Sequence, residues 1–263
     1  MLNDDEFRKL LDYLDRPWSG YRKVRKGVKK RIRRHMEQLD CRTLEAYRQL
    51  IEAQPKEKLH CEQCLLVTIS RFFRDTELWR ILEERLLPQL INDVEPPIRI
   101  WSAGCAGGEE PYSLAILWDS IGGPPTLELL ATDINASCLD RAQEGVFGRG
   151  SLKELPDHLR SAYFRPLKGD HQFSILKEKL ASIQWHTHNL LHSPPPGHFH
   201  MVFLRNNLLT YHQGYQLQVA FDRILSVLTS GGYLVVGSHE TLPASPIKLD
   251  RASDCPWVYR IAK

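Results

Sequence analysis

The 263-residue sequence carries 35 Lys and Arg against 32 Asp and Glu, a net charge of +3, and 42% hydrophobic residues. Its length suggests about two domains with a sizeable core. No stretch approaches the roughly 18 apolar residues of a membrane helix, and the acidic start is unlike a secretory leader, so we expect a soluble, cytoplasmic protein with its six cysteines reduced.

The first predicted segment is helical and strongly basic. Residues Arg16 to Arg48 contain twelve Lys or Arg and only three acidic residues, so the basic charge of the chain belongs to this one element. Apolar residues three or four positions apart predict an amphipathic helix over residues 20–40. Its apolar stripe consists of Val24, Val28, Ile32, Met36 and Leu39.

Two further helices are expected at 43–53 and 76–90 from the same periodicity. Glu95, Pro96 and Pro97 then interrupt the pattern. We therefore place a domain boundary here, with a helical domain over residues 1–95 and a second domain over 96–263.

The second domain alternates short strands with helices. Strands are expected at 98–103, 127–132, 183–188, 199–204 and 233–237, and helices at 109–120, 136–143 and 213–228. This alternation predicts an α/β fold whose doubly wound, mostly parallel sheet is covered on both faces. A hairpin at 163–176, turning at KGDH, indicates an inserted β-subdomain over about residues 150–181, and a strand at 257–262 would close the sheet edge.

The glycine-rich turn in IWSAGCAGGEEPY (100–112) is the most informative motif. A strand, a glycine turn and a helix open the nucleotide-binding half of a doubly wound sheet, but the spacing from Gly104 to Gly108 is neither GxGxxG nor a P-loop. Glu109 and Glu110 would repel a pyrophosphate, although they suit the helix dipole. A ligand with a positive centre and hydroxyls, such as S-adenosylmethionine, fits better.

Asp133 follows the second strand of this domain, where an acid can accept hydrogen bonds from ribose hydroxyls. Glu109 and Glu110 taken alone are also explained as acids at a helix start. The position of Asp133 favours the nucleoside.

Six blocks in matching order then identify a family resemblance. SAGCAGGEEPYSLA resembles the SA-C-STGEEPYS motif of the chemotaxis-receptor glutamate methyltransferases, the CheR family. The likeness continues through TISRFFRD (68–75), ATDIN (131–135), HNLL (188–191), FLRNNLLTY (203–211) and GGYLVVGSHE (231–240). It implies a class I, Rossmann-like methyltransferase fold with an N-terminal helical domain. It also implies an S-adenosylmethionine-dependent protein-glutamate O-methyltransferase that esterifies chemoreceptors or receptor-like signalling proteins and releases S-adenosylhomocysteine.

The resemblance also implies a set of cofactor-binding residues. Glu110 would meet the ribose or amino-acid end of the cofactor, Asp133 would lie near the adenosine, and Asn189 with Leu190 would border the adenine. The full set is Thr68, Ser70, Arg74, Gly104, Glu110, Asp133, Asn189, Leu190, Arg205 and Asn206.

Methylating a glutamate needs little acid or base chemistry, because a carboxyl with a pKa of about 4.3 is already ionised at neutral pH. The enzyme must mainly align and desolvate the acceptor. We expect Arg74 to hold the acceptor carboxylate, since a guanidinium can fork onto two oxygens. A surface arginine at a helix start is the alternative for Arg74.

Three positions depart from the family pattern. Thr68 replaces an asparagine, and His200 replaces a strand aspartate. The active-site tyrosine of the family aligns with Thr210, so Tyr211, our second catalytic candidate, falls one residue late. A one-residue offset at a strand end points to the other face. Either the backbone brings Tyr211 into the site or the role of the tyrosine is lost.

The basic helix is expected to attract and orient the acidic helical bundle of a receptor. The candidates are Arg22, Arg25, Lys26, Lys29, Lys30, Arg33 and Arg34. RNA, an anionic membrane surface and a merely solvated face remain alternatives. We expect a monomer with no transmembrane segment and no stably bound nucleic acid.

No metal is expected from the sequence. Cys61 and Cys64 form a lone CxxC beside His60 without a second pair, and the histidines between His186 and His200 are divided by three prolines. Two other functions stay open: a divergent module that binds S-adenosylmethionine or S-adenosylhomocysteine with little catalysis, and a methyltransferase acting on a small molecule or RNA.

Overall fold

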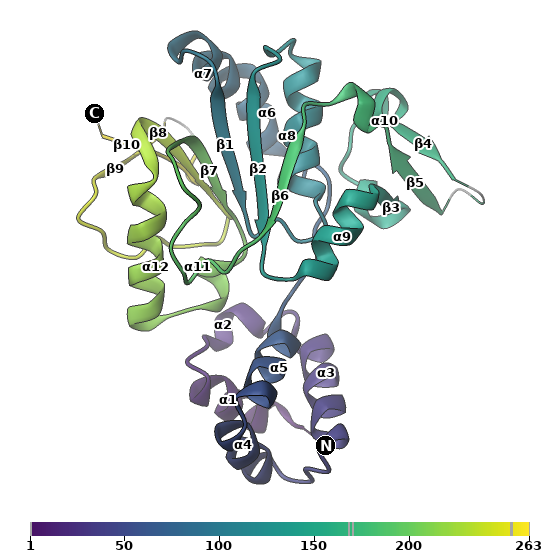
Figure 1. Cartoon of the computed structure of the whole chain (residues 1–263), viewed down its shortest axis with the longest axis vertical. Coiled ribbons are helices and arrows are strands. Elements are labelled where there is room, and N and C mark those ends of the chain that lie inside the picture. Colours follow the sequence, from purple (N-terminus) through teal and green to yellow (C-terminus); the bar gives the residue numbers. More distant parts are fainter. Residues whose placement is uncertain (1, 168, 170, 253–254, 263) are drawn as a thin grey trace. The chain divides into compact units, whose positions relative to one another are not determined.

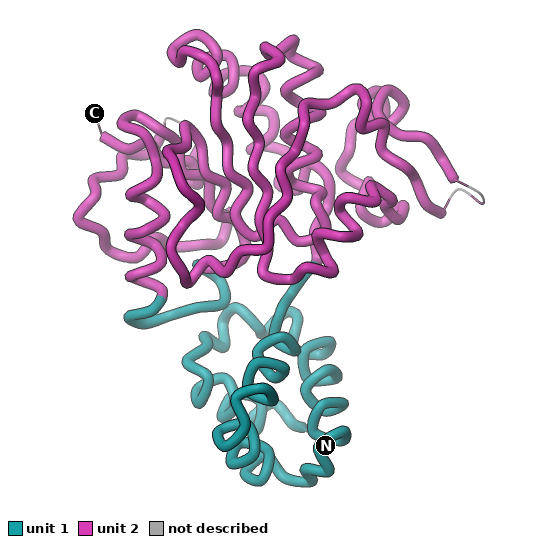
Figure 2. Tube along the Cα trace, viewed as in Figure 1, with its two compact units in different colours: residues 1–68, 209–216 teal, residues 69–208, 217–263 magenta. Residues whose placement is uncertain are grey.

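A computed structural model describes residues 2–167, 169, 171–252 and 255–262. The chain divides into two compact units (Figure 2). The helical unit comprises residues 1–68 and 209–216, and the sheet unit comprises residues 69–208 and 217–263. None of the described helices is both long and apolar enough to span a membrane.

The helical unit is built on the predicted amphipathic stripe. Its helices from the first segment are α1 (Asp4–Tyr13), α2 (Trp18–Tyr21), α3 (Arg25–Gln38), α4 (Leu44–Ala53) and α5 (Pro55–Leu65). On α3, Val28, Ile32 and Met36 are buried in a core shared with the other helices. Side-chain caps fix two helix starts, because Asn3 accepts from the Glu6 amide and Thr43 accepts from the Ala46 amide.

The unit boundary falls at residue 68, not at the predicted residue 95. The segment between them forms α6 (Thr76–Ile81), a π-helical turn (Leu82–Leu86) and α7 (Leu87–Asp93). Its apolar side chains, including Leu82 and Leu86, are buried in the same core as Ile100 of the sheet. The diproline therefore ends a helix of the sheet unit.

The predicted parallel sheet is present (Figure 1). Its strand order is β6-β2-β1-β7-β8-β10-β9. The first five strands are parallel to one another, and β10 pairs antiparallel with both of its neighbours, β8 and β9. The bounds are β1 (Ile98–Ala103), β2 (Leu127–Asp133), β6 (Ile183–Thr187), β7 (Phe199–Leu204), β8 (Leu228–Val236), β9 (Leu249–Arg251) and β10 (Val258–Ile261). β10 lies beside β8, but β9 adds a further strand, so the expectation that 257–262 closes the edge was wrong.

Helices cover both faces of this sheet (Figure 1). They are α8 (Glu109–Ser120), α9 (Ala136–Glu144) and α12 (Gly214–Ser226), together with α6 and α7, whereas most of the short helix α11 (Leu208–Tyr211) belongs to the helical unit. Five of the six residues of β1 are buried, as expected for a strand packed on both sides. Among the central strands, this double cover buries most residues of β1 and β7, whereas the outer strands β6 and β9 have no buried residue.

A small antiparallel sheet with order β3-β5-β4 forms the inserted subdomain. It contains β3 (Val146–Gly148), a 3₁₀ turn (Arg149–Leu152), α10 (Asp157–Tyr163), β4 (Phe164–Pro166), β5 (Gln172–Ile175) and a second 3₁₀ turn (Lys177–Lys179). The predicted hairpin corresponds to β4 and β5, although β3 was not predicted. Lys168 and Asp170 of the predicted turn lie outside the described residues.

Candidate functional site

The glycine turn connects the carboxyl end of β1 to α8. Gly104 adopts φ +79°, and its amide donates to the Thr132 carbonyl of β2 at 2.8 Å. A Cβ on Gly104 would collide with the Asn207 side chain, whose amide donates to the Ala103 carbonyl. Glycine is required here because the turn has both a left-handed backbone and a close neighbour.

Asp133 lies at the end of β2, beside this turn. Its Oδ2 accepts from the Ala106 amide and its Oδ1 from the Asn135 amide, each at 2.8 Å. Burial raises the pKa of Asp133, and the backbone hydrogen bonds oppose that shift. Each carboxylate oxygen keeps acceptor capacity beyond one bond, so Asp133 can still accept from the hydroxyls of a ligand.

Glu110 is fixed by two partners at the first turn of α8. The Ser102 hydroxyl donates to its Oε1 at 2.8 Å, and the Arg205 guanidinium donates to its Oε2 at 2.9 Å. Ser102 comes from β1 and Arg205 follows β7, so the carboxylate is positioned by two neighbouring strands of the sheet.

Arg205 also holds the turn formed by the RFFRD block. Its Nη2 donates to the Arg74 carbonyl at 3.0 Å and to Asp75 Oδ2 at 2.7 Å. Phe73 and Asp75 both have positive φ, at 52° and 65°, a strained conformation for non-glycine residues. The two Nη atoms of Arg205 bind three acceptors and stabilise this turn, whereas its buried Nε has no hydrogen-bond partner among the described residues. The main contribution of Arg205 is therefore to position the site.

The side chain of Arg74 is available, in contrast to that of Arg205. Arg74 is partly exposed, and within the described part of the chain its guanidinium has no hydrogen bond or ion pair. Its backbone is well fixed, because the Trp79 indole and Arg205 both donate to its carbonyl. A rigid backbone with a free guanidinium is suited to binding a carboxylate ligand.

Asn206 follows Arg205 in a left-handed conformation, at φ 55°. The Glu240 carboxylate accepts from the amides of Asn206 and Gly237, at 2.9 and 2.7 Å. Glu240 therefore joins the segments that follow β7 and β8, which fixes one more edge of the site.

Asn189 and Leu190 lie in the turn after β6, where both are partly buried. The His188 amide donates to the Asp133 carbonyl at 3.0 Å, which ties this turn to the end of β2. Asn189 Oδ1 accepts from the Leu191 amide at 3.0 Å. The structure thus brings Gly104, Glu110, Asp133, Asn189, Leu190, Arg205 and Asn206 to the same edge of the sheet, with Arg74 fixed there through its carbonyl.

Glu109 does not share the role of Glu110. It is 7% exposed and accepts from Ser151 at 3.2 Å and from Ser70. Burial raises the pKa of Glu109, and no hydrogen-bond partner of its Oε2 is found among the described residues. Ser70, a predicted cofactor residue, thus contacts a buried acid below the glycine turn.

Thr68 and Tyr211 belong to the helical unit. Thr68 is exposed, and Tyr211 packs against Tyr21 with ring centroids 5.0 Å apart. We expected a strand end at Tyr211, but residues 208–211 form helix α11. Successive side chains of a helix differ by about 100° in direction, so the two-face argument does not apply between Thr210 and Tyr211.

His200 has a structural explanation. Its Nδ1 accepts from the Arg99 amide at 3.0 Å, between the adjacent strands β7 and β1. Burial and the nearby Arg99 lower the pKa of His200, which favours the neutral, accepting ring. A carboxylate at this position could accept the same bond.

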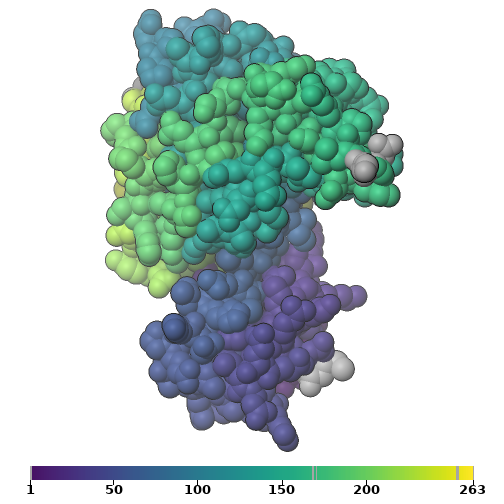
Figure 3. All heavy atoms as spheres, turned by 45° about the vertical axis from the view of Figure 1, so that its right-hand side comes forward, coloured from purple at the N-terminus to yellow at the C-terminus, as the bar shows by residue number. Residues whose placement is uncertain are grey.

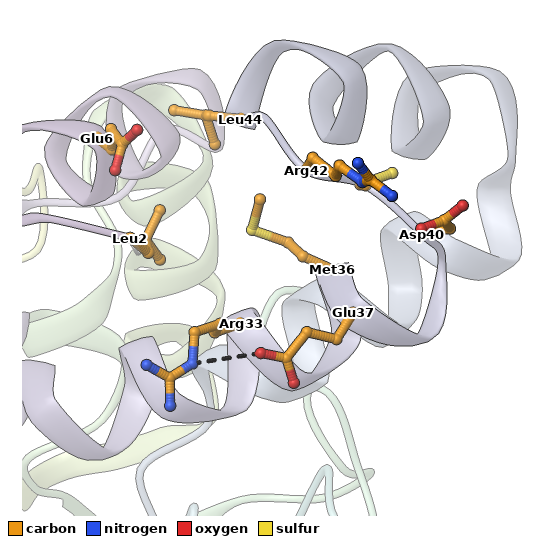
Figure 4. Close-up of a pocket in the computed structure, with 9 residues that line it drawn as sticks. Leu2, Glu6, Arg33, Met36, Glu37, Asp40, Arg42 and Leu44 are labelled. Atoms are coloured by element: carbon orange, nitrogen blue, oxygen red, sulfur yellow. Dashed lines mark ion pairs between the residues drawn. The ribbon is translucent and has the colours of Figure 1, made fainter.

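The seven basic candidates fall into two groups. Arg25 and Lys29 pair with Asp4 at 3.1 and 2.6 Å. Arg33 pairs with Glu37 at 3.5 Å, beside a cavity of about 370 Å³ whose lining includes Leu2 and Met36 (Figure 4). The exposed side chains without an ion pair in the described residues are Arg22, Lys26, Lys30 and Arg34. The N-terminal segment that carries them is the purple surface in Figure 3.

Several positioning residues were not predicted from the sequence. Ser102, Asp75 and Glu240 each lie inside a block that carried the family resemblance, in IWSAG, RFFRD and GSHE. Their type and position in those blocks were the available signals. Their partners are distant in sequence, so only the fold shows what they bind.

Comparison with known proteins gives one consistent family. A family model described as "CheR methyltransferase, SAM binding domain" matches residues 68–257. A chemotaxis protein methyltransferase from Listeria innocua is 33% identical over 178 residues, covering 68% of this chain and 67% of that protein. Chemotaxis protein methyltransferase Cher2 from Pseudomonas putida is 28% identical over 247 residues, covering 90% of this chain and 89% of that protein.

Solved structures show a weaker likeness. The N-methyltransferase NodS from Bradyrhizobium japonicum, in complex with S-adenosylhomocysteine, is 16% identical with a TM-score of 0.34, covering 62% of this chain and 63% of that one. A likeness this slight carries no functional argument.

Proposed function

Because the chain belongs to the CheR methyltransferase family, we propose that it is an S-adenosylmethionine-dependent protein-glutamate O-methyltransferase acting on the cytoplasmic part of chemoreceptors or receptor-like signalling proteins. The observation that carries this proposal is the family match over residues 68–257, which includes every segment at the site edge of the sheet. Relatives named chemotaxis protein methyltransferases support the choice of substrate class.

The residues present fit the cofactor. Asp133 keeps acceptor capacity for ribose hydroxyls, and Gly104 gives the turn beside it the left-handed backbone and the close packing on Asn207 that hold it in place. Glu110 supplies negative charge near a positive centre, and Asn189 with Leu190 would border the adenine. When bound, S-adenosylmethionine supplies an activated methyl group on a sulfonium.

The chain itself contributes binding and alignment. The acceptor glutamate is ionised at neutral pH, so no base is needed to remove a proton. The free guanidinium of Arg74 binds the acceptor carboxylate and orients one oxygen. Arg205 keeps Arg74 in place through its carbonyl and through Asp75.

The four exposed cations, Arg22, Lys26, Lys30 and Arg34, give the helical unit a surface that attracts acidic helices. This supports a receptor bundle rich in glutamate as the substrate.

The test is transfer of a labelled methyl group from S-adenosylmethionine to a purified receptor cytoplasmic fragment. We expect methyl esters that alkali releases as volatile methanol. The matched control is the same fragment with its acceptor glutamates changed to glutamine, which should accept no label. Label that resists alkali, or label on both fragments, would contradict the proposal.

A second candidate is a binding module without efficient transfer. Two observations favour it: Tyr211 packs against Tyr21 in the helical unit, and Thr210 stands where the sequence comparison places the tyrosine of the family. Under this alternative, calorimetry shows tight binding of S-adenosylhomocysteine, and the receptor fragment acquires no alkali-labile label.

A further inference from the structure

The helical unit contains a cluster of two histidines and a glutamate. His35 comes from α3, and Glu57 and His60 come from α5. One potential ligand atom from each residue lies within 4.8 Å of the other two. Glu57 and His60 are three residues apart on one helix, which places them on the same face.

We propose that His35, Glu57 and His60 bind a divalent transition-metal ion, Zn²⁺ by preference. Two imidazoles and a carboxylate are a donor set that zinc accepts, with bonds of roughly 2.0–2.2 Å. Ligand atoms around a tetrahedral zinc are then about 3.4 Å apart. The Glu57 Oε2 atom lies 2.9 Å from His35 Nε2 and 3.9 Å from His60 Nδ1, so the observed separations bracket that value.

The cluster has both a fixed side and an open side. The side chain of His35 is 2% exposed, whereas Glu57 is 25% and His60 48% exposed. An ion can therefore enter from the solvent past His60 and meet a buried ligand that is already positioned. Three protein ligands leave a fourth position for water.

Tyr47 provides the outer contact that a metal-binding histidine requires. Its hydroxyl lies 2.8 Å from His35 Nδ1 and also makes a hydrogen bond with Cys61. To bind the ion, His35 carries its proton on Nδ1 and donates it to the Tyr47 oxygen, and the Tyr47 hydroxyl turns to the Cys61 sulfur. The imidazole stays neutral throughout, so the ion displaces no net proton from it.

A simple hydrogen bond between His35 and Glu57 leaves one observation unexplained. The ring of His60 lies against that of His35, with centroids 4.0 Å apart, and approaches the same Glu57 oxygen. The cysteines of the CxxC pair are not part of the cluster, since Cys61 is fully buried and makes a hydrogen bond with Tyr47. The donor set is nitrogen and oxygen, not sulfur.

An ion at this position would connect α3 to α5. It would thereby hold the helix that carries Lys26, Lys30 and Arg34 and raise the stability of the helical unit, because an ion that binds only the folded state stabilises it.

Metal-free full-length protein should be titrated with ZnCl₂ by calorimetry and with CoCl₂ by visible absorption. We expect one equivalent of Zn²⁺, cobalt bands of tetrahedral type, and a higher melting temperature with Zn²⁺. His60→Ala and Glu57→Gln should each weaken binding by more than the roughly 10–100-fold that loss of an outer contact costs. His158→Ala, at an exposed histidine of the sheet unit, is the matched control and should bind like the wild type.

Tyr47→Phe distinguishes an effect on metal binding from a loss of folding, because it keeps the ring and removes only the hydroxyl that contacts His35. We expect a folded protein with roughly 10–100-fold weaker Zn²⁺ binding. Absence of stoichiometric Zn²⁺ binding by the wild type would overturn the proposal. Equal binding by His60→Ala, Glu57→Gln and His158→Ala would overturn it too.

Discussion

The Arg205 guanidinium lies 2.9 Å from the Glu110 carboxylate, and the Arg205 side chain is only 3% exposed. The same guanidinium lies 2.7 Å from Asp75, so one buried cation joins the glutamate of the glycine turn to the strained RFFRD turn. The ends of two separate chain segments are thereby fixed by a single residue. Arg205 is a positioning residue in this arrangement.

Arg205→Met should destabilise the protein by about 3 kcal/mol, because it leaves two partly buried carboxylates without their shared cation. Arg205→Lys should cost less, yet it cannot restore the fork that reaches three acceptors. Urea unfolding measures the stability, and calorimetry with S-adenosylhomocysteine should show weaker binding for both variants. In a double-mutant cycle with Glu110→Gln, additive effects would contradict direct coupling of the pair.

The centre of the sheet could be predicted from sequence because β1 and β7 are largely apolar runs of six residues, IRIWSA and FHMVFL, with five buried residues each. Strands β3 and β9 have three residues each and lack such a pattern. The unit boundary was misplaced because Pro96 and Pro97 mark the end of a helix, whereas the boundary depends on which core Leu82 and Leu86 enter.

The acids of the site were visible in the sequence, since the motifs locate Glu110 at the start of a helix and Asp133 at the end of a strand. The cation that binds Glu110 was not visible, because Arg205 is 95 positions away and meets it only in the folded chain. The same limit hid the cluster of His35 and Glu57, 22 positions apart on two packed helices. The roles assigned to individual cofactor residues stay predictions.

Arg74→Ala should lower kcat/KM for the receptor fragment by about 100-fold, because the acceptor carboxylate loses its orienting partner. Arg74→Lys should recover only part of this loss, since an ammonium lacks the fork. Arg71→Ala is the control, because Arg71 is a near neighbour that pairs with Glu154 at 2.7 Å. The idea fails if Arg74→Ala and Arg71→Ala give equal kinetics, or if binding of S-adenosylhomocysteine falls as far as kcat/KM.

Two glycines of the helical unit should respond oppositely to alanine. A Cβ on Gly20 would collide with the Thr210 backbone carbonyl, so Gly20→Ala should destabilise by about 1–3 kcal/mol. A Cβ on Gly27 would meet only Arg31 Nη1 at 3.8 Å, so Gly27→Ala within α3 should stabilise by about 0.5–1 kcal/mol. Thermal unfolding distinguishes them. Similar melting temperatures for the two variants would refute the packing of Thr210 on α2.

Glu109→Gln should change how stability depends on pH. Burial raises the pKa of Glu109 above 4.5, the value of the unfolded chain, so the folded state binds more protons between the two pKa values. The contribution of Glu109 to stability is therefore present at low pH and lost as pH rises through that interval. Relative to wild type, the variant should gain stability as the pH rises above about 4.5 in urea unfolding. A difference that does not vary with pH would contradict this, and Glu144→Gln, at an exposed site, gives the baseline.

The exposed cations of α3 should govern the rate of receptor methylation at low salt. Changing Lys26 and Lys30 together to glutamine should lower kcat/KM several-fold at about 20 mM salt and have little effect at about 300 mM, because screening shortens the reach of these charges. Changing Lys56 and Lys58 on α5 removes the same net charge from another helix and should have a smaller effect. Equal losses for the two double variants would mean that net charge, rather than the α3 surface, attracts the substrate. Initial rates across a salt series decide between these outcomes, since a local docking surface predicts a shallower salt dependence only for the Lys26 and Lys30 variant.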